Sequence, residues 1–179
     1  MLRKCSLFCA IFAVGVFALG ASADITVSFN PEHSWTTVGG TVAVDIVADI
    51  PEDDAILGWG LDLTLDDPSI ASWTLNSIGP MFDAIVGNPD GDLLGGLVPQ
   101  PGNVWGTGVV LATIDFLGLD LGVTGLFMSD DYPTDPTEGF ALDPTGFATV
   151  NYVAGDLCVI PEPAALVLLA VAGLLIRRR

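Results

Sequence analysis

The feature that most constrains the fold is a strict alternation of apolar and polar side chains in three segments, residues 41–50, 59–66 and 110–116. Successive side chains of a β-strand point to opposite faces, so this period predicts strands with one buried and one solvated face. The buried positions that the pattern predicts are Val42, Val44, Ile46, Ala48, Ile50, Trp59, Leu61, Leu63, Leu65, Val110, Ala112, Ile114 and Phe116.

Shorter runs rich in β-branched and aromatic residues predict four further strands, at residues 25–29, 70–76, 123–129 and 147–153. Gly, Pro, Asn and Asp clusters separate the strands, as turns require. No window of residues 24–160 carries an apolar stripe with the helical period that is free of Gly and Pro. The chain is therefore predicted to be all-β, with a single two-sheet β-sandwich of the immunoglobulin-like type in residues 24–157.

Three pieces of this domain resemble the cohesin-like and carbohydrate-binding-module-like sandwiches. Residues 38–42 (VGGTV) resemble the opening of their second strand, residues 61–70 (LDLTLDDPSI) their LxYDPxxL segment, and residues 111–116 (LATIDF) a later strand. The resemblance implies their β-sandwich fold. Asp66 replaces the tyrosine of the second piece, and the partner-binding face of cohesins has no match residue by residue, so dockerin binding is not carried over.

The N-terminus has the build of a secretory signal peptide. A basic start at Arg3 and Lys4 precedes an apolar run over residues 7–19, and Ala21 and Ala23 form a small-x-small cleavage site. Signal peptidase is expected to cut after Ala23, which makes residues 1–23 the signal peptide. The apolar run is shorter than the roughly 20 residues that a permanent anchor needs.

The C-terminus carries three features in order: Pro161-Glu162-Pro163, an apolar run over residues 164–176, and Arg177-Arg178-Arg179. A helix over the apolar run would span about 20 Å against a hydrocarbon core of about 30 Å. Residues 158–179 resemble the PEP-CTERM sorting signal of bacteria. The resemblance implies processing by an exosortase and delivery to the cell surface or extracellular matrix. A tail anchor that remains uncut is the alternative, and in both cases the domain faces outward.

The charge distribution excludes two classes of function. The formal net charge is −17, and all five basic residues lie within four residues of a terminus. Contacts with phosphate groups need Lys and Arg, so the domain is not expected to bind nucleic acid or anionic membranes. The protein is expected to touch a membrane only through its terminal segments.

Catalytic candidates are sparse. His33 is the only histidine, and Ser34 beside it is a sequence neighbour rather than a triad partner, because triad partners converge from separate elements. Cys158 stands alone once the signal peptide is removed, so no disulfide is expected within the mature domain. The domain is therefore predicted not to be an enzyme.

Calcium is the best metal candidate, because it takes oxygen ligands from Asp, Asn and Glu. Asn88, Asp90 and Asp92 alternate around Gly91 in a predicted tight loop, and we name them as the candidate calcium ligands. Two further acidic groups are residues 52–54 and the set Asp130, Asp131 and Asp135. The alternative is a solvated acidic surface that keeps an exported protein soluble.

The four tryptophans raise a carbohydrate hypothesis. Trp59 and Trp73 follow buried strand phases and are expected in the core, whereas Trp35 and Trp105 lie near Gly-rich stretches and are candidates for exposed sugar-stacking rings. Placement in the core or at its margin is the favoured alternative for any one tryptophan. The sequence as a whole predicts an exported bacterial surface or matrix protein with a non-catalytic binding, adhesion or structural domain. The alternatives are an extracellular polysaccharide hydrolase and a calcium-dependent carbohydrate-binding module. The expected partners are signal peptidase and exosortase during export, then a polysaccharide or matrix protein.

Overall fold

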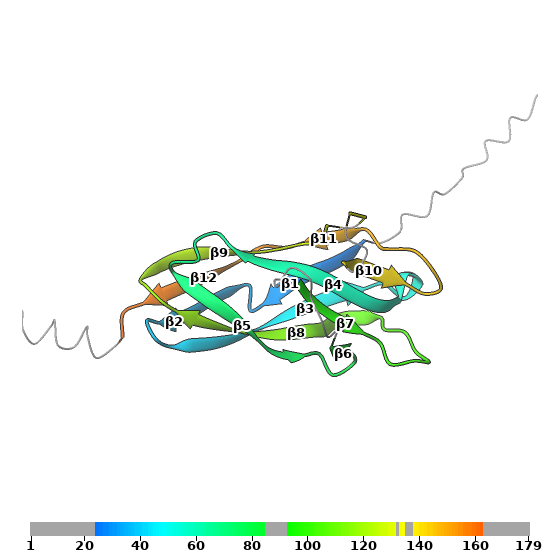
Figure 1. Ribbon diagram of the computed structural model, residues 1–179, viewed down its shortest axis with the longest axis horizontal. Helices are drawn as coiled ribbons and strands as arrows, with labels where there is room; N and C mark the ends of the chain where they lie inside the picture. The colour runs from blue at the N-terminus through cyan, green and yellow to red at the C-terminus, as the bar shows by residue number, and fades with distance from the viewer. Residues whose placement is uncertain (1–23, 85–92, 132, 135–137, 163–179) are drawn as a thin grey trace, which may run out of the picture.

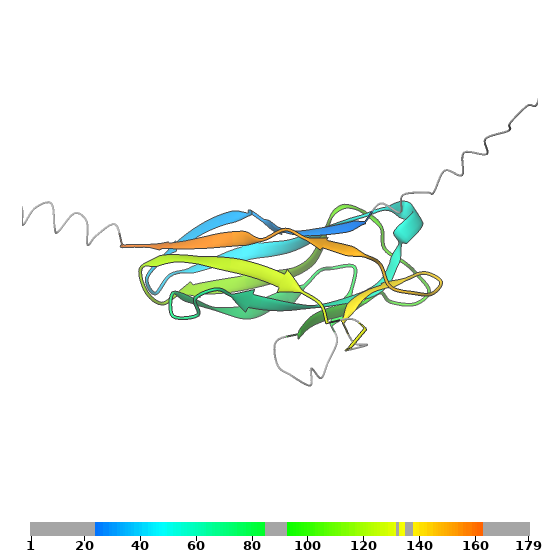
Figure 2. The same cartoon turned by 90° about the horizontal axis from the view of Figure 1, so that it is seen from above.

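A computed structural model describes residues 24–84, 93–131, 133–134 and 138–162. They form two layers of strands that run along the long axis of the molecule (Figures 1 and 2). The elements are β1 (Ile25–Asn30), β2 (His33–Thr37), β3 (Thr41–Ile50), the 3-10 turn η1 (Glu52–Asp54), β4 (Ile56–Leu65), β5 (Ala71–Ile78), β6 (Asp83–Ala84), β7 (Leu93–Leu97), β8 (Gly106–Gly118), β9 (Gly122–Ser129), β10 (Gly139–Leu142), β11 (Val150–Tyr152) and β12 (Gly155–Ile160).

The two sheets differ in size. The five-stranded sheet has the order β11-β1-β3-β8-β5, and the seven-stranded sheet has the order β2-β12-β9-β4-β7-β6 with β10 paired to β4. The predicted all-β sandwich is therefore confirmed.

The helices expected in the signal peptide and in the C-terminal apolar run lie outside the described residues. Among the residues that the structure describes, no helix is long and apolar enough to cross a membrane.

Two of the connections that carry the chain from one sheet to the other are only two residues long. β1 belongs to the five-stranded sheet, and after Pro31 and Glu32 the chain continues in the seven-stranded sheet as β2. In the same way, β11 belongs to the five-stranded sheet and β12 to the seven-stranded sheet, and Val153 and Ala154 connect them. β12 extends to Ile160 and pairs in parallel with β2, so the strand ladder continues past residue 157.

The core confirms the alternation of β3 and β4. Val44, Ile46, Ala48 and Ile50 are buried on one face of β3, as predicted. Trp59 is only 2% exposed and meets Phe82 edge to face, with ring centroids 6.0 Å apart. Such a contact adds about 1 kcal/mol to the free energy gained by burying the rings.

The predicted phase of β8 is wrong at one end. Ile114 and Phe116 are buried as expected, but Val109 and Leu111 are buried in place of Val110. The register shifts where Ile46 pairs with Ala112 and Val47 pairs with Val110, which leaves Leu111 as an extra residue. An inserted residue of this kind reverses the alternation on its far side.

The edge strand β5 also departs from expectation. Ala71 is buried and Trp73 is half-buried against the core, but Leu75 on the same predicted face is exposed. The register of β5 against β8 shifts between Leu75 and Ser77. A strand at a sheet edge that also carries a bulge turns part of its inner face to solvent.

Candidate binding surface and hollow at strand β2

An open space lies beside β2 because β2 belongs to one sheet, whereas β1 and β3, which precede and follow it in the sequence, belong to the other. β2 pairs with β12, and a tight turn in which Gly40 N donates to Thr37 O over 2.8 Å then returns the chain to the other sheet as β3. β1 pairs only with residues 45–49 of β3, so residues 41–44 of β3 are paired with β8 alone. A gap between the edges of β2 and β3 follows from this arrangement.

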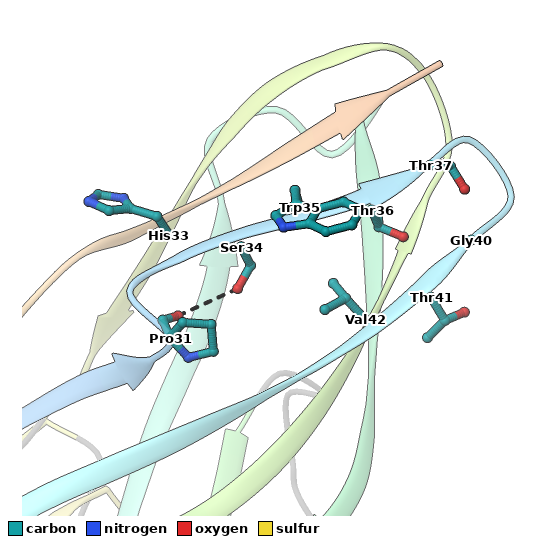
Figure 3. Close-up of a pocket in the computed structure, with 9 residues that line it drawn as sticks. All are labelled: Pro31, His33, Ser34, Trp35, Thr36, Thr37, Gly40, Thr41 and Val42. Atoms are coloured by element: carbon teal, nitrogen blue, oxygen red, sulfur yellow. Dashed lines mark hydrogen bonds between the residues drawn. The ribbon is translucent and has the colours of Figure 1, made fainter. Parts of the chain in front are cut away.

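This gap forms a hollow of about 460 Å³, which Figure 3 shows between the two strands. Pro31 stands at one end of the hollow and the turn at Gly40 stands at the other. Gly40 allows the close approach of two hydroxyls there, because a Cβ would lie 2.6 Å from Thr37 Oγ1 and 2.9 Å from Thr36 Oγ1. The lining residues are Pro31, His33, Ser34, Trp35, Thr36, Thr37, Gly40, Thr41 and Val42.

Side chains of β2 alternate between the interior and the solvent. Ser34 and Thr36 are buried, whereas Trp35 is 68% exposed and its indole lies above Val42 at the hollow (Figure 3). The Ser34 hydroxyl is 3.5 Å from the carbonyl oxygen of Pro31, which is at the limit of a hydrogen bond. That hydroxyl therefore retains most of its bonding capacity.

The backbone of β2 contributes polar groups to the same hollow. The ladder with β12 begins with Asp156 N donating to Glu32 O and ends with Val38 N donating to Ile160 O. In a parallel ladder, alternate residues direct both backbone groups to the same neighbour. The backbone groups of His33 and Trp35 are therefore directed away from β12, toward the open edge of β2.

The outer face of the seven-stranded sheet carries an apolar patch next to the hollow. Cys158 on β12 is paired with Trp35 on one side and with Val123 on the other, so the three side chains form a row. Val123 is 64% exposed and Phe127 is 44% exposed. The Phe127 ring lies against Gly125, where a Cβ would be 2.7 Å from Phe127 Cε2. Trp35, Cys158, Val123 and Phe127 are called the outer apolar patch below.

Carboxylates surround this patch. Asp156 is paired with Gly125 across the two strands, and its Oδ2 lies 2.6 Å from His33 Nδ1. Asp66 and Asp67 are exposed at the other side of Gly125. Hydrogen bonds from the hydroxyl and backbone N–H of Ser69 hold the pKa of Asp67 below its usual value, so this carboxylate stays charged.

His33 and Ser34 do not form a catalytic pair. They are successive residues of one strand, so His33 projects to the outer face while Ser34 projects inward. The imidazole is held by Asp156 instead. This geometry agrees with the prediction that their adjacency carries no triad.

Three carboxylates meet where Asp62 of β4 pairs with Ser129, the last residue of β9. Oxygen atoms of Asp62, Asp131 and Glu138 all lie within 4.8 Å of one another, and Glu138 is only 2% exposed. The backbone N–H of Asp131 donates to Glu138 Oε2. Three oxygen donors of this type suit calcium better than a softer metal.

Tyr152 and Asp130 lie beside this acidic group. The Tyr152 hydroxyl donates to Asp130 Oδ2 over 2.6 Å. Burial raises the pKa of Tyr152 well above its usual value, and the hydrogen bond to Asp130 and the charges of Glu138 and Asp62 raise it further. A tyrosinate there would be desolvated and would repel its acidic neighbours.

The predicted calcium ligands Asn88, Asp90 and Asp92 lie outside the described residues, as does Asp135. Of the second acidic group, Asp131 joins Asp62 and Glu138, whereas Asp130 binds Tyr152. Asp62 and Glu138 were not among the predicted ligands. They are far apart in sequence, and only the pairing of β4 with β9 and β10 brings them together.

The sequence interpretation of the tryptophans agrees with the structure in most respects. Trp59 is in the core, Trp73 is half-buried, and both Trp35 and Trp105 are more than half exposed. Only Trp35 lines the hollow. β2 was missed as a strand because it is short and the side chains that it buries are hydroxyl-bearing.

Of the predicted processing residues, the structure describes two. Pro161 and Glu162 are exposed directly after β12. Ala21, Ala23, Pro163, Arg177, Arg178 and Arg179 lie outside the described residues.

No protein-family model and no curated protein matches this sequence. Solved structures of cohesin domains do match the fold. The seventh ScaB type I cohesin of Pseudobacteroides cellulosolvens gives a TM-score of 0.57 at 16% identity, covering 78% of this chain and 94% of that one. The third ScaC cohesin of Acetivibrio cellulolyticus, solved in complex with a dockerin, gives 0.55 at 16% identity, with coverages of 76% and 99%.

A cohesin of Clostridium acetobutylicum gives a TM-score of 0.53 at 15% identity, with coverages of 76% and 90%. These likenesses cover 90–99% of each cohesin and 76–78% of this chain. At such low identity they bear on architecture alone. The described residues of this chain therefore have the two-sheet β-sandwich fold of cohesin domains.

Proposed function

We propose that this chain is an exported, non-catalytic binding domain that acts at the cell surface or in the extracellular matrix. The proposal of export rests on the signal-peptide pattern that ends at Ala23, and the proposal of exosortase sorting rests on Pro161-Glu162-Pro163 with its apolar run and Arg tail. The exposed position of Pro161 and Glu162 after the last strand supports it, because a processing enzyme needs an accessible segment.

The observation that carries the binding function is the outer apolar patch. Exposed aromatic and aliphatic side chains in one contiguous group are typical of protein interaction sites. The surrounding carboxylates, with no Lys or Arg anywhere in residues 24–160, select a partner whose own surface carries basic residues around an apolar strip. Several of the similar structures are cohesins in complex with dockerins, which supports a protein partner in general terms.

The hydrolase alternative has less support. Glycosidases hold their two carboxyl groups roughly 5–9.5 Å apart, with room for the sugar or water between them. The carboxylate oxygens of Asp62, Asp131 and Glu138 lie closer together than this, and Glu138 is buried. This group is better suited to holding a cation than to attacking a glycosidic bond.

Calcium binding is the second candidate function. Asp62, Asp131 and Glu138 favour it, because like charges at this distance repel each other unless a cation or a proton intervenes. The loop with Asn88, Asp90 and Asp92 remains the other candidate site.

Binding through the patch is tested on cells of the producing organism from which this gene has been deleted. Labelled protein should bind these cells in a saturable way. Replacing Val123 and Phe127 together with Asp should abolish that binding, whereas replacing Leu75 with Asp should leave it intact, because Leu75 is similarly exposed but lies on the other sheet. Equal binding by the two variants would contradict the assignment of the patch.

A further inference from the structure

We propose that the hollow beside β2 binds the ring of a neutral sugar, stacked on the indole of Trp35. This inference rests on the proposed function in one respect, because it also takes the domain to be a non-catalytic binding module. It uses the open edge of β2, which shares only Trp35 with the outer apolar patch. The two proposals therefore make separate predictions.

The exposure of Trp35 favours a ligand that stacks on its indole. A tryptophan commonly contributes 150–250 Å² of buried surface to a fold, yet Trp35 remains 68% exposed although its strand is fully paired with β12. The ring lies above Val42 and borders the hollow (Figure 3). A pyranose presents a face of C–H groups that covers such a ring, whereas the fold itself gains little from placing an indole there.

The polar groups that line the hollow favour a ligand with hydroxyl groups. The Ser34 hydroxyl lies at the hollow with only a long contact to Pro31 O, and the hydroxyls of Thr36 and Thr37 are gathered at the Gly40 end. The backbone groups of Trp35 are directed to the same open edge. Hydroxyls and backbone amides both donate and accept hydrogen bonds, as the hydroxyl groups of a sugar require.

The charges in and around the hollow favour an uncharged ligand. Among the residues that the structure describes, the lining contains no carboxylate and no Lys or Arg, and the titratable side chain that it does contain, His33, is engaged by Asp156. A cation therefore has no carboxylate ligand in the hollow. An anion, such as a uronic acid or a phosphate, would meet the field of a protein with a formal net charge of −17. Among polar ligands, a neutral polyhydroxyl compound is the class that remains.

The hollow is small. Pro31 stands at one end and the turn at Gly40 stands at the other (Figure 3). A volume of about 460 Å³ lies within the range of small-molecule sites. The hollow therefore suits one or two sugar rings.

The test uses the full-length protein and a fixed panel of neutral sugars: glucose, galactose, mannose, N-acetylglucosamine, cellobiose and maltose. Each is titrated to about 20 mM, a range that detects millimolar affinity, with tryptophan fluorescence and saturation-transfer NMR as readouts. At least one sugar should bind. Replacing Trp35 with Ala should weaken its binding about tenfold or more, as for truncation of a central aromatic contact.

The matched control is Trp105→Ala, because Trp105 is similarly exposed but does not line the hollow. This variant should retain the affinity of the parent. Ser34→Ala should weaken binding severalfold while leaving the unfolding temperature nearly unchanged, because its hydroxyl makes only the long contact within the described part of the chain. Circular dichroism of each variant confirms that it is folded.

Three results would overturn the proposal. The first is that no sugar of the panel gives a signal that depends on Trp35. The second is that binding is lost in Trp105→Ala rather than in Trp35→Ala. The third is that glucuronate binds as tightly as glucose. Failure of the proposed protein partner would look different. The double Asp replacement at Val123 and Phe127 should abolish binding to cells while leaving the sugar titration unchanged.

Discussion

The hydroxyl of Tyr152 donates a 2.6 Å hydrogen bond to Asp130 Oδ2 beside three further carboxylates. A phenol can occupy this position only while it keeps its proton. The folded protein thus holds Tyr152 protonated through the pH range in which an unfolded tyrosine ionises, near pH 10.

This relationship predicts an alkaline limit to stability. The folded pKa is raised above the unfolded value, so the contribution is fully present below about pH 10 and is lost as the pH rises beyond it. The free energy of unfolding should fall by up to about 1.4 kcal/mol per pH unit in that range. Tyr152→Phe should remove this dependence, at a cost of about 1 kcal/mol at neutral pH. Urea unfolding at pH 8, 10 and 11 measures both effects, and parallel pH profiles for the two proteins would contradict the prediction.

Core packing predicts a sharp contrast between neighbouring residues of β4. Leu63 is buried between the sheets and Thr64 is exposed. Leu63→Ala should lower the free energy of unfolding by about 2–5 kcal/mol, because it leaves a cavity. Thr64→Ala should change it by about 0.5 kcal/mol or less, as a surface substitution. Denaturant unfolding of the two variants compares them directly, and similar losses would mean that the strand phase is wrong.

Calcium is predicted to stabilise the protein beyond its effect as a salt. At a hundredfold excess over the dissociation constant the gain is about 2.7 kcal/mol. Thermal unfolding in millimolar calcium, in chelator, and in sodium chloride of matched ionic strength separates specific binding from screening. Equal stabilisation by both salts would leave the carboxylates as a solubility device.

Two sets of variants locate the ion. If the buried group holds it, Asp131→Asn should remove the calcium-specific gain, and the double replacement of Asp90 and Asp92 with Asn should retain it. The opposite outcome would assign the site to the loop that contains Asn88. Both sets should leave the sodium response unchanged, since each removes little of the total charge.

Processing at both ends is predicted from the sequence. Material isolated from the cell surface should begin at Asp24 and should lack Arg177, Arg178 and Arg179. Intact-mass spectrometry measures both ends at once. A surface species that retains the Arg tail would refute removal of the C-terminal segment and favour a tail anchor.

Alternation in the sequence was sufficient to place β3 and β4, because a strand with one buried face must place apolar side chains at every second position. The same rule failed within β8, where an extra residue at Leu111 reverses the phase. That bulge depends on how β3 and β5 pair with β8 on either side. Nothing local to residues 110–116 marks it.

The candidate site was only partly predictable. Trp35 was a candidate for exposure because it lies near a Gly-rich stretch, although core placement was the favoured alternative for any one tryptophan, and the structure shows it exposed. The hollow beside it was not predictable, because it forms where β2 leaves β1 and β3 to pair with β12, more than a hundred residues later in the chain. Cys158, for which the sequence predicted only the lack of a disulfide partner in the mature domain, lies in the middle of the outer apolar patch for the same reason.

The sequence by itself determined the class of fold, the sign of the surface charge and the absence of basic side chains from residues 24–160, since period and composition are local properties. Only the tertiary structure decided which carboxylates meet and which side chains share a face. Asp62 approaches Glu138, and Trp35 lies in line with Val123, through pairings between strands that are distant along the chain. The energy of such pairings depends on the packing of the whole sandwich, which no local pattern encodes.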